Sequence, residues 1–161
     1  MRKVMMAVVL SSIAVATNNA MRDVDLTAPT AAISIDRKEA KVDHVKRRRE
    51  QIVKAIALQE SSGDSTMLNK VEDAVGYLQI RKIMVREVNR LTGSRYTYED
   101  RWSKTKSIDL FIKYNEVVNP EWDLEKACRL WNGGLSGMRK ESTEWYYREV
   151  KAKFIALGKG R

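Results

Sequence analysis

The chain has 161 residues, enough for one domain with a sizeable core. Its formal net charge of +9 favours an anionic partner such as nucleic acid, a membrane surface or a phosphate-bearing cell wall. A single cysteine excludes an intrachain disulfide. The chain also has a single histidine. One His and one Cys are too few side chains for a typical zinc site, and they leave little choice for a Ser-His or Cys-His catalytic pair. We therefore expect neither a metal site nor a cofactor.

The first twenty residues have the pattern of a secretory signal peptide. Arg2 and Lys3 precede an apolar run from Val4 to Ala16, and small or polar residues follow up to Ala20. The run is shorter than the roughly 20 apolar residues that a transmembrane helix needs, although an uncleaved N-terminal anchor stays open as the alternative. We expect an exported protein of the periplasm or cell envelope. Because an exported protein rarely meets nucleic acid, the expected anionic partner is an envelope polymer and not nucleic acid.

The rest of the chain divides into a linker and one helical domain. Residues 21–40 contain Thr, Ala, Asp and Pro29 without a clear period, which predicts a flexible linker. Residues 41–161 form the predicted domain, with irregular polar loops at 61–76 and 92–104 and no evident period-2 strands. The expected fold is compact and mainly α, with little or no sheet. Apolar residues at helical spacing predict five helices, over about 40–60, from Ile80 to Leu91, from Ile108 to Val118, from Leu124 to Trp131 and from Thr143 to Leu157.

Several polar or reactive residues have ordinary structural interpretations. Cys128 lies in an apolar helical pattern, which indicates a buried core thiol. His44 lies in a polar segment, which indicates a surface position. The basic run Lys46-Arg47-Arg48-Arg49 falls on the polar side of the first helix, so we expect a solvated face and no nucleic-acid site. Ser142 or Thr143 is the expected N-cap of the last helix.

Glu60 is the best candidate for a chemical centre. The last turn of a helix carries partial negative charge, which raises the pKa of a carboxyl group placed there, and apolar neighbours such as Ile56 would raise it further. A carboxylic acid that stays protonated near neutral pH can donate a proton to a glycosidic oxygen. Glycoside hydrolysis usually needs a second carboxylate, and the following loop offers Asp64, Glu72 and Asp73 without favouring one of them. By itself Glu60 would be an ordinary surface glutamate.

Glu60 is accompanied by other segments, and together they resemble a known family. In chain order they are Glu60-Ser61, Gly76-Tyr77-Leu78-Gln79-Ile80, Trp131-Asn132-Gly133-Gly134 and Thr143-Glu144-Trp145-Tyr146. This order is similar to that of the soluble lytic transglycosylases, members of the lysozyme-like superfamily, whose pattern runs Glu-Ser, Gly-Leu-Met-Gln, Tyr-Asn-x-Gly and Glu-Thr-x-x-Tyr. The resemblance covers about residues 45–157 and implies a lysozyme-like fold.

The resemblance implies an enzyme that cleaves peptidoglycan glycan strands without a cofactor, and we expect it to be a monomer. Glu60 would act as acid and then as base on the β-1,4 bond between N-acetylmuramic acid and N-acetylglucosamine. Family members need no second catalytic carboxylate, because the N-acetyl group of the substrate assists. The muramic 6-hydroxyl then closes a 1,6-anhydro ring in place of attack by water.

The resemblance also implies where the substrate binds. One wall of a saccharide cleft would come from residues 76–80 and the opposite wall from the Trp131-Asn132 segment. A hydroxyl group near the reacting centre and a hydrogen-bonding support for the acid complete the implied site. The residues concerned are Ser61 as the support, Tyr77 and Gln79 in the first wall, Trp131 and Asn132 in the second, and Tyr146 as the hydroxyl.

This sequence departs from the family pattern at several positions. Tyr77 and Leu78 occupy the Leu-Met positions, Trp131 replaces the usual tyrosine, and Ser142 replaces a glutamate. Loss of the hydroxyl at Trp131 would let water compete, so a hydrolytic muramidase that uses a carboxylate from the loop after Glu60 is the alternative. A catalytically silent glycan-binding protein of the same fold is another.

Overall fold

A computed structural model describes the backbone of residues 27–160 and the side chains of residues 42–160. The predicted signal peptide, residues 1–20, lies outside the described residues. The described part is mainly helical, which confirms the predicted fold class, and none of its helices has the length and apolarity needed to cross a bilayer. The elements are α1 Thr27–Ser61, β1 Leu68–Asn69, β2 Ala74–Val75, β3 Ile80–Arg81, α2 Lys82–Thr92, the 3-10 helix η1 Glu99–Trp102, α3 Lys104–Val118, α4 Leu124–Gly133, the 3-10 helix η2 Gly134–Arg139 and α5 Ser142–Lys159.

Helix α1 begins earlier than the sequence pattern predicted. Residues 27–40, expected to be a flexible linker, form its first turns. Pro29 lies in the first turn, where its missing N–H interrupts no helical hydrogen bond, and the residues after it include Ala, Arg, Lys and Glu, which favour helices. Contacts within the chain separate residues Met1–Arg37 from residues Lys38–Arg161, and the core and cavities described below belong to the second unit.

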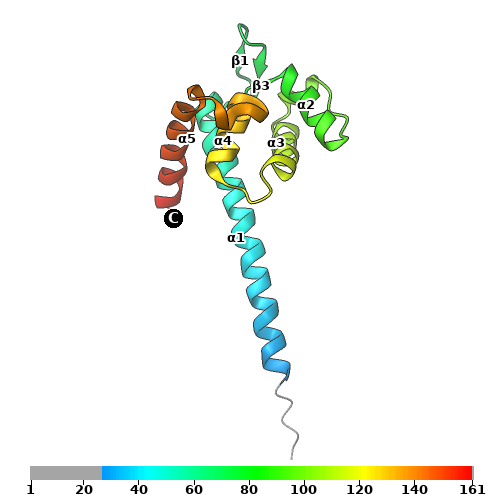
Figure 1. Ribbon diagram of the computed structural model, residues 1–161, viewed down its shortest axis with the longest axis vertical. Helices are drawn as coiled ribbons and strands as arrows, with labels where there is room; N and C mark the ends of the chain where they lie inside the picture. The colour runs from blue at the N-terminus through cyan, green and yellow to red at the C-terminus, as the bar shows by residue number, and fades with distance from the viewer. Residues whose placement is uncertain (1–26, 161) are drawn as a thin grey trace, which may run out of the picture. The chain divides into compact units, whose positions relative to one another are not determined.

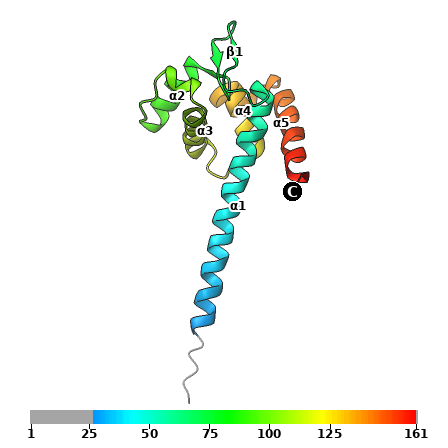
Figure 2. The same cartoon turned by 180° about the vertical axis from the view of Figure 1, so that it is seen from behind.

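The core forms around the C-terminal part of α1, next to α3, α4 and α5 (Figures 1 and 2). Ile52 and Ile56 of α1 have no exposed surface. Phe111 of α3 packs edge-on against Trp131 of α4, with ring centroids 4.9 Å apart. Burial of these large apolar side chains is the main source of stability, at about 25 cal/mol for each Å² removed from water. Packing of α1 against the core therefore holds the last turn of the helix, which carries Glu60, in a fixed position.

The structure confirms two of the local predictions and corrects a third. Cys128 is fully buried and His44 is exposed, both as predicted. Of the basic run, the first two residues are exposed, but Arg48 and Arg49 are half-buried and pack against the core. Arg48 donates from Nε to the carbonyl oxygen of Trp122 at 3.2 Å, and the guanidinium of Arg49 lies 4.6 Å from the centroid of the Trp122 ring. Long side chains can bury their stems in this way, so this face is only partly solvated.

A small antiparallel sheet, in the order β1-β2-β3, occupies the segment where no strands were predicted. Each strand has only two residues, too few to produce a period-2 pattern in the sequence. The register aligns Asn69 with Ala74 and Ala74 with Arg81, so these three residues form one row across the sheet. Side chains in such a row point to the same face, and this face is the one that borders the cavity described below.

Buried Arg101, from η1, fixes the sheet in place. Its Nη1 donates to the carbonyl oxygens of Asp73 at 2.8 Å and Ile80 at 3.1 Å, and its Nε donates to that of Tyr98 at 2.8 Å. The backbone at Gly76 has φ +76°, and a Cβ there would overlap the carbonyl oxygen of Arg101. Only glycine meets both conditions without strain, which explains its presence in the predicted 76–80 motif.

Candidate active site

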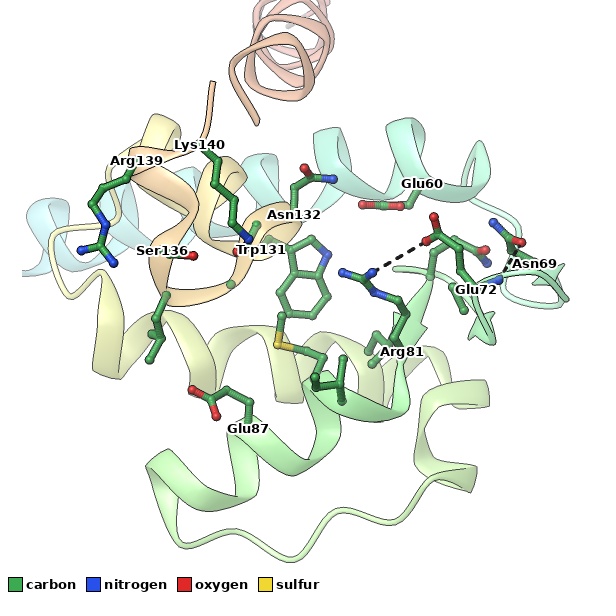
Figure 3. Close-up of a pocket in the computed structure, with 18 residues that line it drawn as sticks. Glu60, Asn69, Glu72, Arg81, Glu87, Trp131, Asn132, Ser136, Arg139 and Lys140 are labelled. Carbon is green, nitrogen blue, oxygen red and sulfur yellow. Dashed lines mark hydrogen bonds and ion pairs between the residues drawn. The ribbon is translucent and has the colours of Figure 1, made fainter. Parts of the chain in front are cut away.

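A cavity of about 730 Å³ is enclosed by the end of α1, the sheet, α2 and the α4–η2 segment (Figure 3). Its size is that of a pocket for a small molecule or a short oligomer. The sheet contributes the row Asn69, Ala74 and Arg81. Of the seven residues predicted to form a site, four line this cavity: Glu60, Gln79, Trp131 and Asn132.

Glu60 lies in the last turn of α1 and faces the cavity (Figure 3). Its Oε1 accepts a hydrogen bond of 2.6 Å from the hydroxyl group of Tyr146. Burial raises the pKa of Glu60 from 4.5 to about 7, although the Tyr146 hydrogen bond and the positive charge of Arg81 lower it and the negative charge of Glu72 raises it. A substantial fraction of Glu60 is thus protonated at neutral pH, and the group can both donate and accept a proton there.

Tyr146 itself is almost fully buried and comes from α5. Burial, with the neighbouring Glu60 carboxylate, holds the pKa of its hydroxyl group well above the usual value. The hydroxyl therefore stays protonated and remains a hydrogen-bond donor to Glu60. The structure brings Tyr146 to Glu60, but behind the acid and not among the residues that line the cavity.

Ser61 follows Glu60 and is also buried. Its hydroxyl donates to the carbonyl oxygen of Tyr77 at 2.8 Å, with the carbonyl oxygen of Ala57 as a second acceptor at 3.2 Å. These contacts join the end of α1 to the 76–80 turn across 16 residues of sequence. Ser61 thus supports the site from behind and does not line the cavity.

The turn from Gly76 to Gln79 holds its two predicted site residues differently. Gln79 has a positive φ of 46°, and its Nε2 donates to the carbonyl oxygens of Gly76 at 3.0 Å and Met67 at 3.1 Å, so that its side chain is fixed at the cavity wall. Tyr77 is absent from this wall. It lines a second cavity, bordered by α1 and α3, and the ammonium group of Lys104 lies 4.5 Å from the centroid of its ring. The structure therefore does not place Tyr77 where a ligand in the first cavity could touch it.

The opposite wall is formed by Trp131, Asn132 and the glycines that follow them. Trp131 is largely buried by Phe111 and Tyr114, so only a small part of its ring reaches the cavity. Asn132 is exposed and can offer both a donor and an acceptor. This wall therefore combines a rigid aromatic base with one free amide.

Thr143 fixes this wall to the start of α5. Its hydroxyl accepts from Arg129 Nε at 3.0 Å and lies 2.7 Å from the carbonyl oxygen of Lys140. A Cβ on Gly133 would lie 2.7 Å from the Thr143 methyl group. Thr143 itself lies inside α5, whose N-cap is Glu141. The prediction of Ser142 or Thr143 as the cap is therefore wrong. Thr143 instead packs against Gly133 and so joins the start of α5 to the end of α4.

Of the three carboxylates considered as partners of Glu60, only Glu72 lines the cavity. Asp64 is exposed and accepts two hydrogen bonds from Thr66, which lower its pKa. Asp73 pairs with Lys82 at 2.9 Å, and this contact is the main cause of its lowered pKa. Glu72 lies 4.0 Å from Arg81 Nη1, and both side chains are about half exposed.

Sequence reasoning missed Arg81, Asn69 and Arg101. Arg81 and Asn69 reach the cavity through the register of very short strands, and the sequence carries no pattern that fixes this register. Arg101 binds the backbone carbonyl groups of Asp73 and Ile80. It lies in η1, within the segment 92–104 that was expected to be an irregular loop. The one signal for Arg81 was its position two residues after Gln79.

Among residues 42–160, no group of three or more His, Cys, Asp or Glu side chains is placed to hold a metal ion. Comparison with known proteins adds no further constraint. No protein-family model, curated protein or solved structure matches this chain. Its function is therefore argued from the cavity and from the residues that line it.

Proposed function

We propose that this protein cleaves the β-1,4 bond between N-acetylmuramic acid and N-acetylglucosamine in peptidoglycan, with Glu60 as the catalytic acid and base. The observation that carries the proposal is a carboxyl group with a pKa of about 7, hydrogen-bonded to a buried tyrosine, at the wall of a cavity of about 730 Å³. The resemblance to soluble lytic transglycosylases supports the same assignment, because four of the seven site residues that it predicted line one cavity. The fold proposed is accordingly lysozyme-like.

In the first step the proton of Glu60 passes to the glycosidic oxygen as the bond from that oxygen to the muramic C1 breaks. The Glu60 carboxylate formed in this step accepts the hydrogen bond from Tyr146, and Arg81 lies close enough to lower its pKa. Both contacts stabilise the negative charge that appears on Glu60, so they favour proton transfer. Gln79 and Asn132, on opposite walls, are the polar groups that hold the sugar rings.

In the second step the Glu60 carboxylate accepts a proton from the muramic 6-hydroxyl, whose oxygen attacks C1 and closes the 1,6-anhydro ring. The proton returns to Glu60, and no water is consumed. This outcome makes the protein a lytic transglycosylase. It needs only one catalytic carboxylate, with the N-acetyl group of the substrate stabilising the cation at C1.

A hydrolytic muramidase is the second candidate, and the position of Glu72 favours it. Glu72 lines the same cavity as Glu60 and is near enough to raise its pKa. A carboxylate on that wall could bind the water that attacks C1, in place of the muramic hydroxyl. The two candidates share Glu60 as the acid and differ only in which oxygen attacks.

Export to the periplasm or cell envelope is part of the proposal, because the substrate lies there. Removal of the predicted signal peptide takes away Arg2 and Lys3 and lowers the net charge from +9 to +7, which would still hold the protein on the anionic envelope. The proposal includes a monomeric protein.

Digestion of purified peptidoglycan, followed by mass analysis of the soluble fragments, tests the proposal. Muramic ends in the anhydro form support the transglycosylase, and ends heavier by one water support the muramidase. A protein that binds glycan strands and releases no fragments would be the silent glycan-binding alternative.

A further inference from the structure

The charged side chains that line the cavity differ in whether their charge is balanced. Glu72 lies near Arg81, with 4.0 Å between the charged atoms. Glu87 accepts two hydrogen bonds from Arg90, at 2.8 and 3.0 Å. These carboxylates therefore have their own cations, and Glu60 carries little charge while it is protonated.

Arg139 and Lys140 also line the cavity, and neither has an ion-pair partner among the described residues. Lys140 Nζ donates one hydrogen bond, to the carbonyl oxygen of Gly133 at 2.7 Å, and retains two further donors. Figure 3 shows both residues at the η2 end of the cavity, with Glu72 and Asn69 at the other end. The η2 end therefore carries two positive charges that no carboxylate among residues 42–160 balances.

The backbone that presents these two cations is fixed. Arg129 Nη2 donates to the carbonyl oxygen of Met138 at 3.1 Å and to that of Lys140 at 3.3 Å, so the residues on either side of Arg139 are held. Gly137 packs so closely on the backbone of Arg129 that a side chain could not fit. The backbone at this end of the cavity therefore loses little further entropy when an anion binds, although the two exposed side chains must still be ordered.

We propose that Arg139 and Lys140 form a subsite for a carboxylate-bearing substituent of the glycan, such as an acidic peptide stem. The inference rests on the proposed function, since it assigns the η2 end of the cavity to the same substrate. Arg offers a planar fork to a carboxylate and Lys a compact charge, so the pair suits a flexible acidic group. The subsite gives the enzyme a preference for substituted, anionic glycan over a neutral oligosaccharide.

Binding to the Glu60→Gln protein tests this inference without turnover of the ligand. Two soluble probes are compared by calorimetry at an ionic strength of about 0.15 M, where the Debye length is about 8 Å: glycan fragments that carry acidic peptide stems, and a neutral oligomer of N-acetylglucosamine. The test variant adds Arg139→Gln and Lys140→Gln. The matched control adds Arg95→Gln and Lys106→Gln, which remove the same charge from exposed positions outside the cavity.

The test variant should bind the acidic fragments about tenfold more weakly, which corresponds to about 1.4 kcal/mol. It should bind the neutral oligomer within about twofold of the parent, and the control should bind both within about twofold, because distant exposed charges are largely screened. Equal weakening of both probes, or equal weakening by the control, would overturn the subsite. A Glu60→Gln protein that binds neither probe would contradict the proposed function itself, and with it the subsite.

Discussion

Ionisation of Glu60 should destabilise the folded protein as the pH rises. The pKa of Glu60 is about 7 in the folded state against 4.5 for a solvated glutamate, and each pKa unit corresponds to about 1.4 kcal/mol. The folded state therefore holds this proton more tightly than the unfolded state does. The stabilisation is fully present below pH 4.5, is lost as the pH rises through 7, and amounts to about 3 kcal/mol.

Urea unfolding of the wild type and of Glu60→Gln, from pH 4 to pH 9, measures this effect. Glutamine does not titrate, so the difference between the two free energies of unfolding isolates Glu60 from the other carboxylates. We expect this difference to shift by about 3 kcal/mol in favour of Glu60→Gln between pH 4 and pH 9, with most of the change between 4.5 and 7. A difference that stays constant over this range would show that Glu60 has an ordinary pKa, and the argument for a protonated acid at neutral pH would fail.

Other substitutions test the surroundings of the acid. Tyr146→Phe removes a hydrogen bond that lowers the pKa of Glu60, so the alkaline limb of the pH–activity profile should move to higher pH. Glu72→Gln removes a negative charge that raises this pKa, so the alkaline limb should move to lower pH. Shifts in the same direction for both variants would contradict the assignment of Glu60 as the group that titrates. Gly76→Ala should cost at least about 2 kcal/mol in urea unfolding, because alanine must adopt a positive φ and overlap the backbone of η1; a loss below about 0.5 kcal/mol would refute that geometry. Trp131→Tyr should fold and retain activity if the family resemblance is correct, since tyrosine is the usual residue there, and failure to fold, seen by circular dichroism, would count against the alignment.

The sequence predicted the parts of this structure that depend on local periodicity. Helix α2 ends at Thr92, next to the predicted end at Leu91, with Gly93 at a φ of 69° as its C-cap, and Cys128 is buried because an apolar helical stripe must face a core. Glu60 and Asn132 could be assigned to one site because the order of their motifs resembled a known family. Each of these inferences needed only a segment of about ten residues or a fixed order of segments.

The features that the sequence did not predict depend on contacts between distant segments. Arg81 reaches the cavity because Ala74 pairs with it in a strand of two residues, and Arg101 is buried because it binds carbonyl groups 21 and 28 residues away. Tyr77 was assigned to the cavity as a neighbour of Gln79, but it lines another cavity. A neighbour in sequence can point to the opposite side of a chain segment, and only the tertiary structure decides which side faces the ligand.

The proposed role of Glu60 in cleaving glycan strands can be tested by comparing the wild type with a variant that lacks the carboxyl group. Purified peptidoglycan is incubated with the wild type and with Glu60→Gln at equal concentration, and the soluble fragments are identified by mass. We expect fragments with anhydro-muramic ends from the wild type and none from Glu60→Gln. Equal release of fragments by the two proteins, or no release by the folded wild type, would contradict it.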